Sequence, residues 1–269
     1  EFSNKLLDRA AKTGQVAPLC ARHTLTVGNR ITLPTVDETS RATGSRFGGV
    51  QVFWTDEGGN VTTKKPKTRQ LNLTLKKMMG LAYLTDELLE DAPLSASLVE
   101  RAFAEELAYV LDDCIINGDG SGKPLGILNS DALITVAAED GQSAETILAE
   151  NIINMWSRLW SRGRTNAVWF YSQDIEPQLF TMSISVGTGG IPVYMPAGGL
   201  SGKPYGTLFG RPAIPIEQCS TLGTVGDIIL MDPTQYLLVD RGGPRSERSM
   251  HVRFEYDETA FRFVYRADG

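Results

Sequence analysis

The stretch whose residue types come nearest to a chemical motif is the glycine-rich segment 118–128, which reads GDGSGKPLGIL. A phosphate-binding loop needs a glycine, four residues and then Gly-Lys-Ser/Thr, and it follows a strand and opens a helix. Here Asn117 stands where the first glycine should be, and Pro124 replaces the hydroxyl residue that binds magnesium. The segment also follows a predicted helix rather than a strand. These departures disfavour nucleotide binding, and a turn rich in residues with positive φ is the better interpretation.

Other residues that could act in catalysis are not arranged for it. His23 and His251 lie in strand-like stretches without a partner motif, so nucleophilic and metal catalysis have little support. The adjacent pairs Glu105-Glu106 and Asp112-Asp113 point in different directions on a predicted helix and therefore form no catalytic dyad. We interpret them as a solvated or subunit-facing surface. The sequence predicts no catalytic residue, no cofactor and no metal ligand.

Cysteine usage favours a reducing compartment. Cys20, Cys114 and Cys219 are odd in number, far apart and without metal-ligand spacing. Cys114 falls on the apolar stripe of the predicted helix, and we expect it to be buried.

Composition and charge exclude some protein classes. Apolar residues make up 42% of the 269-residue chain, which is typical of a folded protein. The net charge of −6 argues against a surface that binds nucleic acid everywhere, although it permits a protein that encloses DNA. No apolar run reaches the ~18 residues of a membrane helix, and no signal peptide is visible. The chain begins at Glu1 without Met, as expected of a processed or trimmed chain.

One long helix organises the chain. Apolar residues recur at helical spacing from Val99 to Ile115. Ser97 and Glu100 predict a capping box at its start, and Asn117-Gly118 predicts a left-handed stop, which gives about nineteen residues and roughly 28 Å. A short helical turn is expected before it, over Thr85–Glu90.

The contiguous stretch 85–129 carries a family resemblance. A short helix, EDAP, the long amphipathic helix and NGDGSGKPLGIL together closely resemble the major capsid protein of tailed double-stranded DNA bacteriophages and prophages. The resemblance implies a mixed α+β subunit with a long spine helix, a peripheral and an axial lobe, an extended β-hairpin loop and an N-terminal arm. It implies this division of the chain: 1–22, N-terminal arm; 23–47, 78–129 and 228–262, peripheral domain; 48–77, extended hairpin loop; 130–227, axial domain; and 263–269, a return toward the axial domain.

Hairpins are predicted at two places. His23–Pro34 alternates about Gly28-Asn29, which is a strong hairpin signal. Gln51–Thr55 and Leu71–Leu75 are strand-like and flank a basic tip. The residues alone are best interpreted as a solvated hairpin on a larger sheet. Under the resemblance it reaches over the neighbouring subunit, and its basic residues face acidic surface there: Lys64, Lys65, Lys67 and Arg69.

One branch of the capsid family joins a lysine of this loop covalently to an asparagine of a neighbour. Residues 245–254, where the asparagine should lie, contain none. We therefore predict no cross-link.

Beyond residue 129 the sequence predicts alternating strands and helices. Strands are expected over Leu133–Ala137 and Ala167–Tyr171, a helix over Ser143–Arg162, and another helix after Ser172 with Phe180 facing inward. The resemblance implies that the glycine-rich residues 187–227 line the capsomer centre. Further strands are expected over 227–232, 236–240, 251–256 and 259–265. Most relatives continue for another strand, so the chain is expected to end early.

The function implied by the resemblance is mechanical. Copies of the subunit would form pentamers and hexamers of an icosahedral shell around double-stranded DNA, without sequence-specific binding and without a membrane. Scaffold, protease, portal and decoration proteins are possible further partners. The implied location is the virion capsid, after assembly in the bacterial host cytoplasm. The alternatives are the shell of an encapsulin-type nanocompartment and, from another class, a small enzyme with an atypical phosphate loop.

Overall fold

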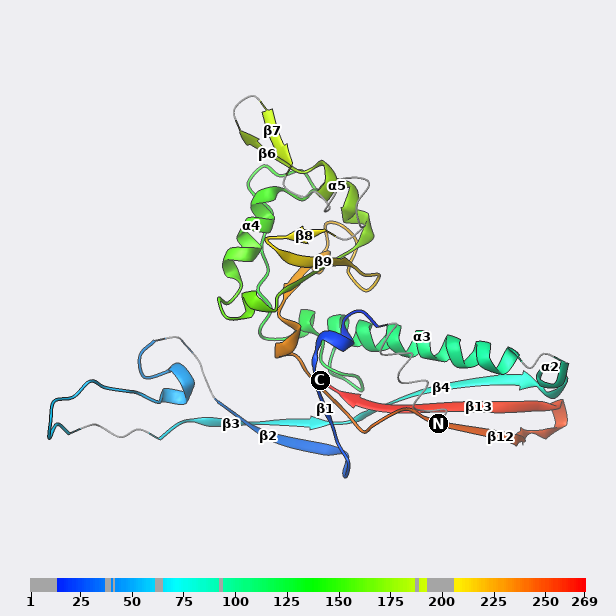
Figure 1. Ribbon diagram of the computed structural model, residues 1–269. Coiled ribbons are helices and arrows are strands. Elements are labelled where there is room, and N and C mark those ends of the chain that lie inside the picture. Colours follow the sequence, from blue (N-terminus) through cyan, green and yellow to red (C-terminus); the bar gives the residue numbers. More distant parts are fainter. Residues whose placement is uncertain are drawn as a thin grey trace.

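The computed structural model describes residues 14–36, 40, 42–60, 65–91, 94–186, 189–192 and 206–269. Two lobes share one long helix at their junction, and a two-stranded ribbon projects from the junction away from both (Figure 1). The mixed α+β class agrees with the prediction. Short 3-10 turns connect the main elements, at Ala17–Leu19, Arg46–Gly49, Ile127–Asn129, Gly163–Thr165, Gln173–Ile175, Pro233–Gln235 and Phe254–Tyr256.

The peripheral lobe is built on a five-stranded sheet. Its strands run in the order β1-β11-β13-β12, and β4 pairs with β13 along ten residues, from Thr85 opposite Glu258 to Lys76 opposite Ala267. Their bounds are β1 Ala21–Thr24, β4 Lys76–Thr85, β11 Leu237–Asp240, β12 Arg245–Arg253 and β13 Glu258–Asp268.

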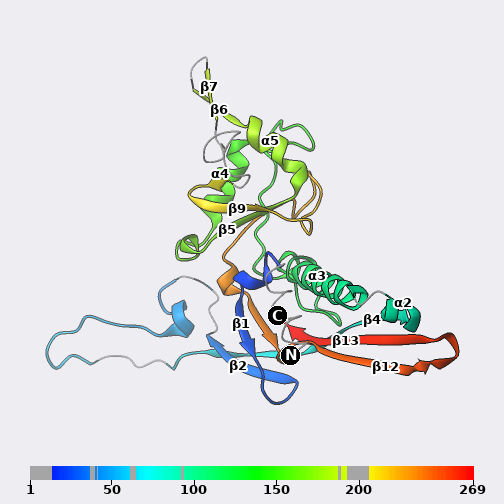
Figure 2. The same cartoon turned by 45° about the vertical axis from the view of Figure 1, so that its right-hand side comes forward.

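One face of this sheet is covered by the long helix. The short helix α2 (Asp86–Asp91) turns the chain back, and α3 (Leu94–Asn117) then runs along the sheet. Phe103 of α3 packs against Phe263 of β13 with ring centroids 4.1 Å apart and the rings tilted by 34°. Gly80 of β4 permits this approach, because a Cβ there would lie 2.5 Å from Phe103 Cε1. Within the described part of the chain, no helix covers the opposite face of the sheet (Figure 2).

The start of α3 differs from the prediction, and so does the reason for its stop. The helix starts at Leu94, so Ser97 and Glu100 lie inside it and cannot form the N-terminal capping box. The stop after Asn117 is confirmed, but Gly118 does not have positive φ. Glycine is required at 118 for space, because a Cβ would lie 2.1 Å from the Pro124 carbonyl oxygen.

The axial lobe surrounds a four-stranded sheet in the order β10-β5-β9-β8. Helix α4 (Ala149–Arg158) and helix α5 (Glu176–Thr181) enclose it, and a small hairpin of β6 and β7 leads outward. The strand bounds are β5 Val168–Tyr171, β6 Ser183–Val186, β7 Gly189–Pro192, β8 Thr207–Leu208, β9 Arg211–Pro215 and β10 Ile228–Met231.

Strand β5 belongs to two hydrophobic cores. Trp169 and Tyr171 face the axial core with Ile152 of α4, whereas Phe170 faces a second core that includes Ile115 at the end of α3. This division follows from the alternation of side chains along a strand. All four residues of β5 are buried, as expected from its sequence.

The projecting ribbon consists of β2 (Arg30–Val36) and β3 (Thr68–Thr74). The predicted hairpin about Gly28-Asn29 is wrong, because β1 pairs in parallel with β11 and β2 pairs with β3. The partner of β3 is therefore β2, and residues 51–55 form no strand. Apolar cross-strand pairs explain this choice of partner: Ile31 lies opposite Leu73, and Leu33 opposite Leu71.

Several predictions for the axial lobe are wrong in detail. Residues 133–137 form no strand. Helix α4 begins six residues later than predicted and ends before Leu159; Glu145 has a φ of +55°, which is incompatible with a helix at that point. Phe180 is 37% exposed and does not face inward.

The boundary between the lobes also lies elsewhere. β10 pairs with β5 in the axial sheet, although residues from 228 onward were expected in the peripheral lobe. β13 continues to Asp268 inside the peripheral sheet, so residues 263–268 do not return toward the axial lobe. Helix α2 agrees with the predicted helical turn within one residue, and β13 includes the strand predicted over 259–265. The strand predicted over 251–256 is misplaced, because β12 begins at Arg245 and residues 254–256 form a 3-10 turn.

Candidate functional site: assembly surfaces

The glycine-rich loop after α3 is closed by its own backbone. Gly126 N donates to Gly118 O at 2.8 Å, and Asp119 and Leu125 form a β-bridge. Lys76 Nζ donates to two loop carbonyls, Gly120 O at 2.7 Å and Lys123 O at 2.6 Å. A phosphate site needs converging N–H groups, whereas here carbonyl oxygens converge on an ammonium. The loop is therefore a structural turn.

Two further contacts fix the loop to the peripheral sheet. Lys76 Nζ lies 3.4 Å from Asp268 Oδ1, and the other oxygen of Asp268 accepts from Thr74 N at 2.9 Å. Tyr236 Oη donates to Leu125 O at 2.9 Å, and burial raises the pKa of this tyrosine. The sequence analysis missed Lys76 and Tyr236, because neither belongs to a local motif.

Asp112 is an internal anchor, not a surface residue. It is 3% exposed, and its carboxylate accepts from the backbone N–H groups of Gln15 (2.7 Å), Val16 (3.2 Å) and Ala17 (2.8 Å). Burial raises the pKa of Asp112, and these three N–H groups oppose that rise. The prediction of a solvated or subunit-facing Asp112 is wrong. From the sequence alone, a buried and a solvent-exposed acidic residue beside an apolar stripe cannot be distinguished.

The other acidic residues of α3 are divided between surface and interior. Glu105 and Glu106 are exposed, and Arg101 Nε donates to Glu105 Oε1 at 2.7 Å. Asp113 is half-buried and accepts from Asn117 Nδ2 at 2.8 Å. Of the four predicted contact residues on α3, Glu105 and Glu106 are thus the exposed ones, and Glu105 already has an ion pair with Arg101.

The basic residues of the projecting loop are exposed where the structure describes them. Lys64 lies outside the described residues, and Lys65, Lys67 and Arg69 are exposed. Lys67 N donates to Gly48 O at 2.8 Å, which fixes the loop at the tip of β3.

The described residues contain no cluster of histidine, cysteine and carboxylate side chains suited to a metal ion. All three cysteines are free thiols; Cys20 and Cys219 are buried, while Cys114 is only half-buried, less than expected. None of the helices in the described part of the chain is long and apolar enough to span a membrane.

Large apolar side chains are exposed at three places that the sequence analysis did not identify as surfaces. Val52 and Trp54 in the projecting loop are 93% and 104% exposed. Met79 and Leu81 lie on the uncovered face of the peripheral sheet, and a third group lies at its far end: Met250, Val252, Phe254 and Tyr256. Contiguous exposed apolar surface marks a site of protein interaction.

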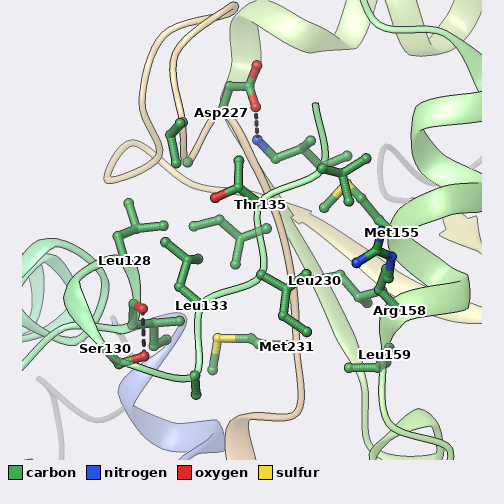
Figure 3. Close-up of a pocket in the computed structure, with 18 of the residues that line it drawn as sticks. Leu128, Ser130, Leu133, Thr135, Met155, Arg158, Leu159, Asp227, Leu230 and Met231 are labelled. Atoms are coloured by element: carbon green, nitrogen blue, oxygen red, sulfur yellow. Dashed lines mark hydrogen bonds between the residues drawn. The ribbon is translucent and has the colours of Figure 1, made fainter. Parts of the chain in front are cut away.

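A wide apolar groove lies where the two lobes meet (Figure 3). It measures about 1150 Å³ and is lined by most of residues 125–138, parts of 142–160 and 223–237, and Leu71 and Leu73 of β3. Leu133, Leu159 and Leu230 point into it, and Arg158 lies on its wall beside Met155.

The sequence model of the phage capsid family matches residues 1–269, the whole chain. The chain belongs to the phage capsid family. Among curated proteins, the major capsid protein of Escherichia phage T5 is 31% identical over 83 residues, which are 30% of this chain and 17% of that protein. The match therefore spans a small part of the T5 protein.

Solved capsid structures share the fold over nearly all of this capsid-family chain. The capsid of an empty GTA particle is 15% identical and superposes with a TM-score of 0.72, covering 95% of this chain and 86% of the other. A chain in the solved structure of Microbacterium phage Oxtober96 is 14% identical, with a TM-score of 0.62 and coverage of 94% of this chain and 83% of the other. At these identities the likeness shows the fold alone.

Membership of the phage capsid family confirms the resemblance and the fold class. It makes this protein a structural component and not an enzyme. The comparisons give no support to a phosphate-loop enzyme or to a nanocompartment shell. In a capsid protein, the exposed apolar side chains, the groove and the projecting ribbon are candidate contacts between subunits.

Proposed function

We propose that this protein is the major shell-forming subunit of a phage particle. Its copies form pentamers and hexamers, and these close into an icosahedral shell around double-stranded DNA. The observation that carries the proposal is the family match over the whole chain. The shape of the subunit also fits this role, because a ribbon projects from one side and apolar side chains of its loop are exposed to solvent.

The projecting ribbon and the body are different surfaces of one subunit. A contact between them is head-to-tail, and head-to-tail contacts close into rings when the rotation between subunits permits it. In this arrangement the axial lobes surround the symmetry axis and the peripheral lobes lie outward. Many weak contacts of this type then act together, so the shell is far more stable than any single interface.

Charge complementarity at the ribbon sets the register of the neighbour. The basic residues Lys64, Lys65, Lys67 and Arg69 would meet the exposed pair Glu105-Glu106 of an adjacent spine helix. Exposed charge pairs contribute more to specificity and association rate than to affinity. Asp112 takes no part in this contact, because it is already bonded inside its own subunit.

The enclosed DNA is held without sequence-specific contacts, which agrees with a net charge of −6. The finished protein is located in the virion capsid and is assembled in the bacterial host cytoplasm. Scaffold, protease, portal and decoration proteins belong to the same proposal. No covalent link joins the subunits, because residues 245–254 contain no asparagine.

Electron microscopy of the purified protein, together with light scattering, tests the proposal. Closed shells, or rings of five and six subunits, are the expected result. A protein that stays monomeric at high concentration in an intact full-length form would refute it. Boiling the shells in SDS should release only monomers, whereas a ladder of covalent oligomers would contradict the absence of cross-linking.

A further inference from the structure

Positive charge is concentrated on the face of the peripheral sheet that α3 does not cover. A shallow cavity of about 230 Å³ lies there, formed by β4, β12, β13 and the turn after β11. Five cationic side chains and one carboxylate line it, although the chain as a whole has a net charge of −6. The cationic residues are Lys77, Arg241, Arg245, Arg262 and Arg266.

The strand register brings these charges together. Lys77 of β4 lies directly opposite Arg266 of β13. Arg245 of β12 lies opposite Val264, which makes Arg266 its diagonal neighbour. Arg241 is adjacent as well, because its backbone N–H donates to Arg266 O at 3.2 Å. Residues opposite each other share one face of a sheet, and like charges in such pairs are destabilising.

The turn that carries Arg241 is fixed by a buried carboxylate. Asp240 is fully buried, and its Oδ1 accepts from Gly242 N at 3.1 Å. Its other oxygen accepts from Arg22 Nε and from Tyr265 Oη. Asp240 thus sets the position of Arg241 on the rim of the cavity, and its own charge is already used inside the subunit.

The carboxylates that share the cationic face are also occupied. Glu247, which lines the cavity, is paired with Arg262. Farther along the face, Glu258 is paired with Arg253, and Asp268 belongs to the contacts of the glycine-rich loop described above. Four cations of the cavity therefore have no ion pair within the described part of the chain: Lys77, Arg241, Arg245 and Arg266.

These four unpaired cations match a ligand with several closely spaced negative charges. Three of them are arginines, whose planar guanidinium groups offer paired N–H donors that fit phosphate oxygens. One carboxylate carries a single charge and would leave most of the cations unpaired. Two or three adjacent phosphate groups supply enough charge within a small volume.

We propose that this cavity binds closely spaced phosphate groups, with Arg266 and Arg245 on β13 and β12, Lys77 on β4 and Arg241 in the turn as the binding residues. Such groups occur in a free oligophosphate and along the backbone of a nucleic acid, and the experiment below distinguishes these sources. The inference does not rest on the proposed function, because the cavity belongs to a single subunit.

Binding of sodium tripolyphosphate to the purified, unassembled protein tests the site. Calorimetric titration should show saturable binding, and the Tm should rise because the ligand binds the folded state. Sodium chloride at the same ionic strength should not reproduce this rise. Arg266→Gln and Lys77→Gln should each weaken binding about tenfold, as expected for the loss of a charged hydrogen bond.

Arg253→Gln is the matched control. Arg253 lies on the same face of the sheet but outside the cavity, and it is paired with Glu258. Its substitution removes the same charge and should change the affinity less than about twofold, since exposed charges at this distance are screened by salt. Equal affinities of Arg253→Gln and Arg266→Gln would overturn the proposal.

The stability of the free variants separates a lost ligand contact from misfolding. Because Lys77 and Arg266 repel each other, Arg266→Gln should have the Tm of the wild type or a higher one without ligand. With tripolyphosphate present, its Tm should be lower than that of the wild type. A lower Tm of both Arg266→Gln and Lys77→Gln without ligand would contradict the repulsion on which the proposal is based.

A labelled DNA duplex identifies the source of the phosphate groups. If the duplex binds the wild type, is displaced by tripolyphosphate and binds Arg266→Gln more weakly, the site accepts a nucleic acid backbone. If tripolyphosphate binds and the duplex does not, the ligand is a free oligophosphate. The absence of saturable binding of both ligands would refute the site.

Discussion

The carboxylate of Asp112, in the last third of the spine helix, accepts a hydrogen bond of 2.8 Å from the backbone N–H of Ala17, 95 residues earlier in the chain. The same carboxylate holds Gln15 and Val16. Val16 is fully buried in the core that also contains Ile115. A single acidic side chain therefore fixes the point at which the described N-terminal segment meets the helix.

Removal of this anchor should destabilise the subunit. Asp112→Ala leaves three backbone donors without their acceptor, and a buried donor without a partner costs about 1–3 kcal/mol. Since water can reach some of them after the change, we expect a loss of about 3 kcal/mol in the free energy of unfolding, measured by urea denaturation. Glu106→Ala, on the exposed face of the same helix, should change it by less than about 0.5 kcal/mol. Equal stability of the two variants would contradict the anchor role.

The pKa of Asp112 predicts a pH dependence. Burial raises the pKa above its ordinary value of 3.8, so the folded state binds the proton more tightly than the unfolded state. The contribution of this group to stability is then greatest below pH 3.8 and is lost as the pH rises through the raised value. Asp112→Asn cannot titrate, so the stability difference between wild type and this variant should fall as the pH rises across that window. A difference that grows with pH would reverse the sign and refute the assignment.

Lys76 should control the order of the glycine-rich loop. Lys76→Met removes the ammonium that binds two loop carbonyls and the Asp268 carboxylate, and a lost charged hydrogen bond costs about 1.5–3 kcal/mol. We expect faster amide hydrogen exchange over residues 119–125 and lower stability. Lys77→Met is the matched control, because Lys77 is the next residue on β4 and is exposed. The same exchange rates in both variants would show that the clamp is unimportant.

The thiols should differ in reactivity. Burial raises the pKa of Cys20 and of Cys219 to about 12, so neither forms an appreciable amount of thiolate at pH 8. Burial also raises the pKa of Cys114, but this residue is half-exposed. Titration with a chromogenic disulfide at pH 8 should detect at most one thiol in the folded protein and three in urea. Rapid reaction of all three without denaturant would show that the cores around Cys20 and Cys219 open readily.

Much of the fold followed from local patterns. The helical spacing of apolar residues in α3 and the continuous apolar run of β5 are strong signals, because each element buries apolar side chains against the rest of the chain. The helix stop at Asn117 was also visible, although the reason for Gly118 was not. Close packing against Pro124, and not a left-handed backbone, requires glycine there.

The errors occurred where a distant partner outcompeted a local signal. Gly28-Asn29 has the composition of a hairpin turn, and Gly28 does have a φ of +87°. The strands on either side nevertheless pair elsewhere, β1 with β11 and β2 with β3. The same limit applies to the site. Asp112 and Lys76 contact backbone atoms that lie 44 to 97 residues away in the sequence, and no spacing rule reveals such contacts.

Strand β5 has a mechanical consequence. Its alternate residues belong to two hydrophobic cores, with Trp169 in one and Phe170 in the other. The two lobes are therefore joined by close-packed side chains and not by a flexible hinge. When outward pressure acts on such a subunit, the load passes from lobe to lobe through close-packed side chains. The two lobes then move together as one rigid body, and the two-stranded ribbon is the part that bends.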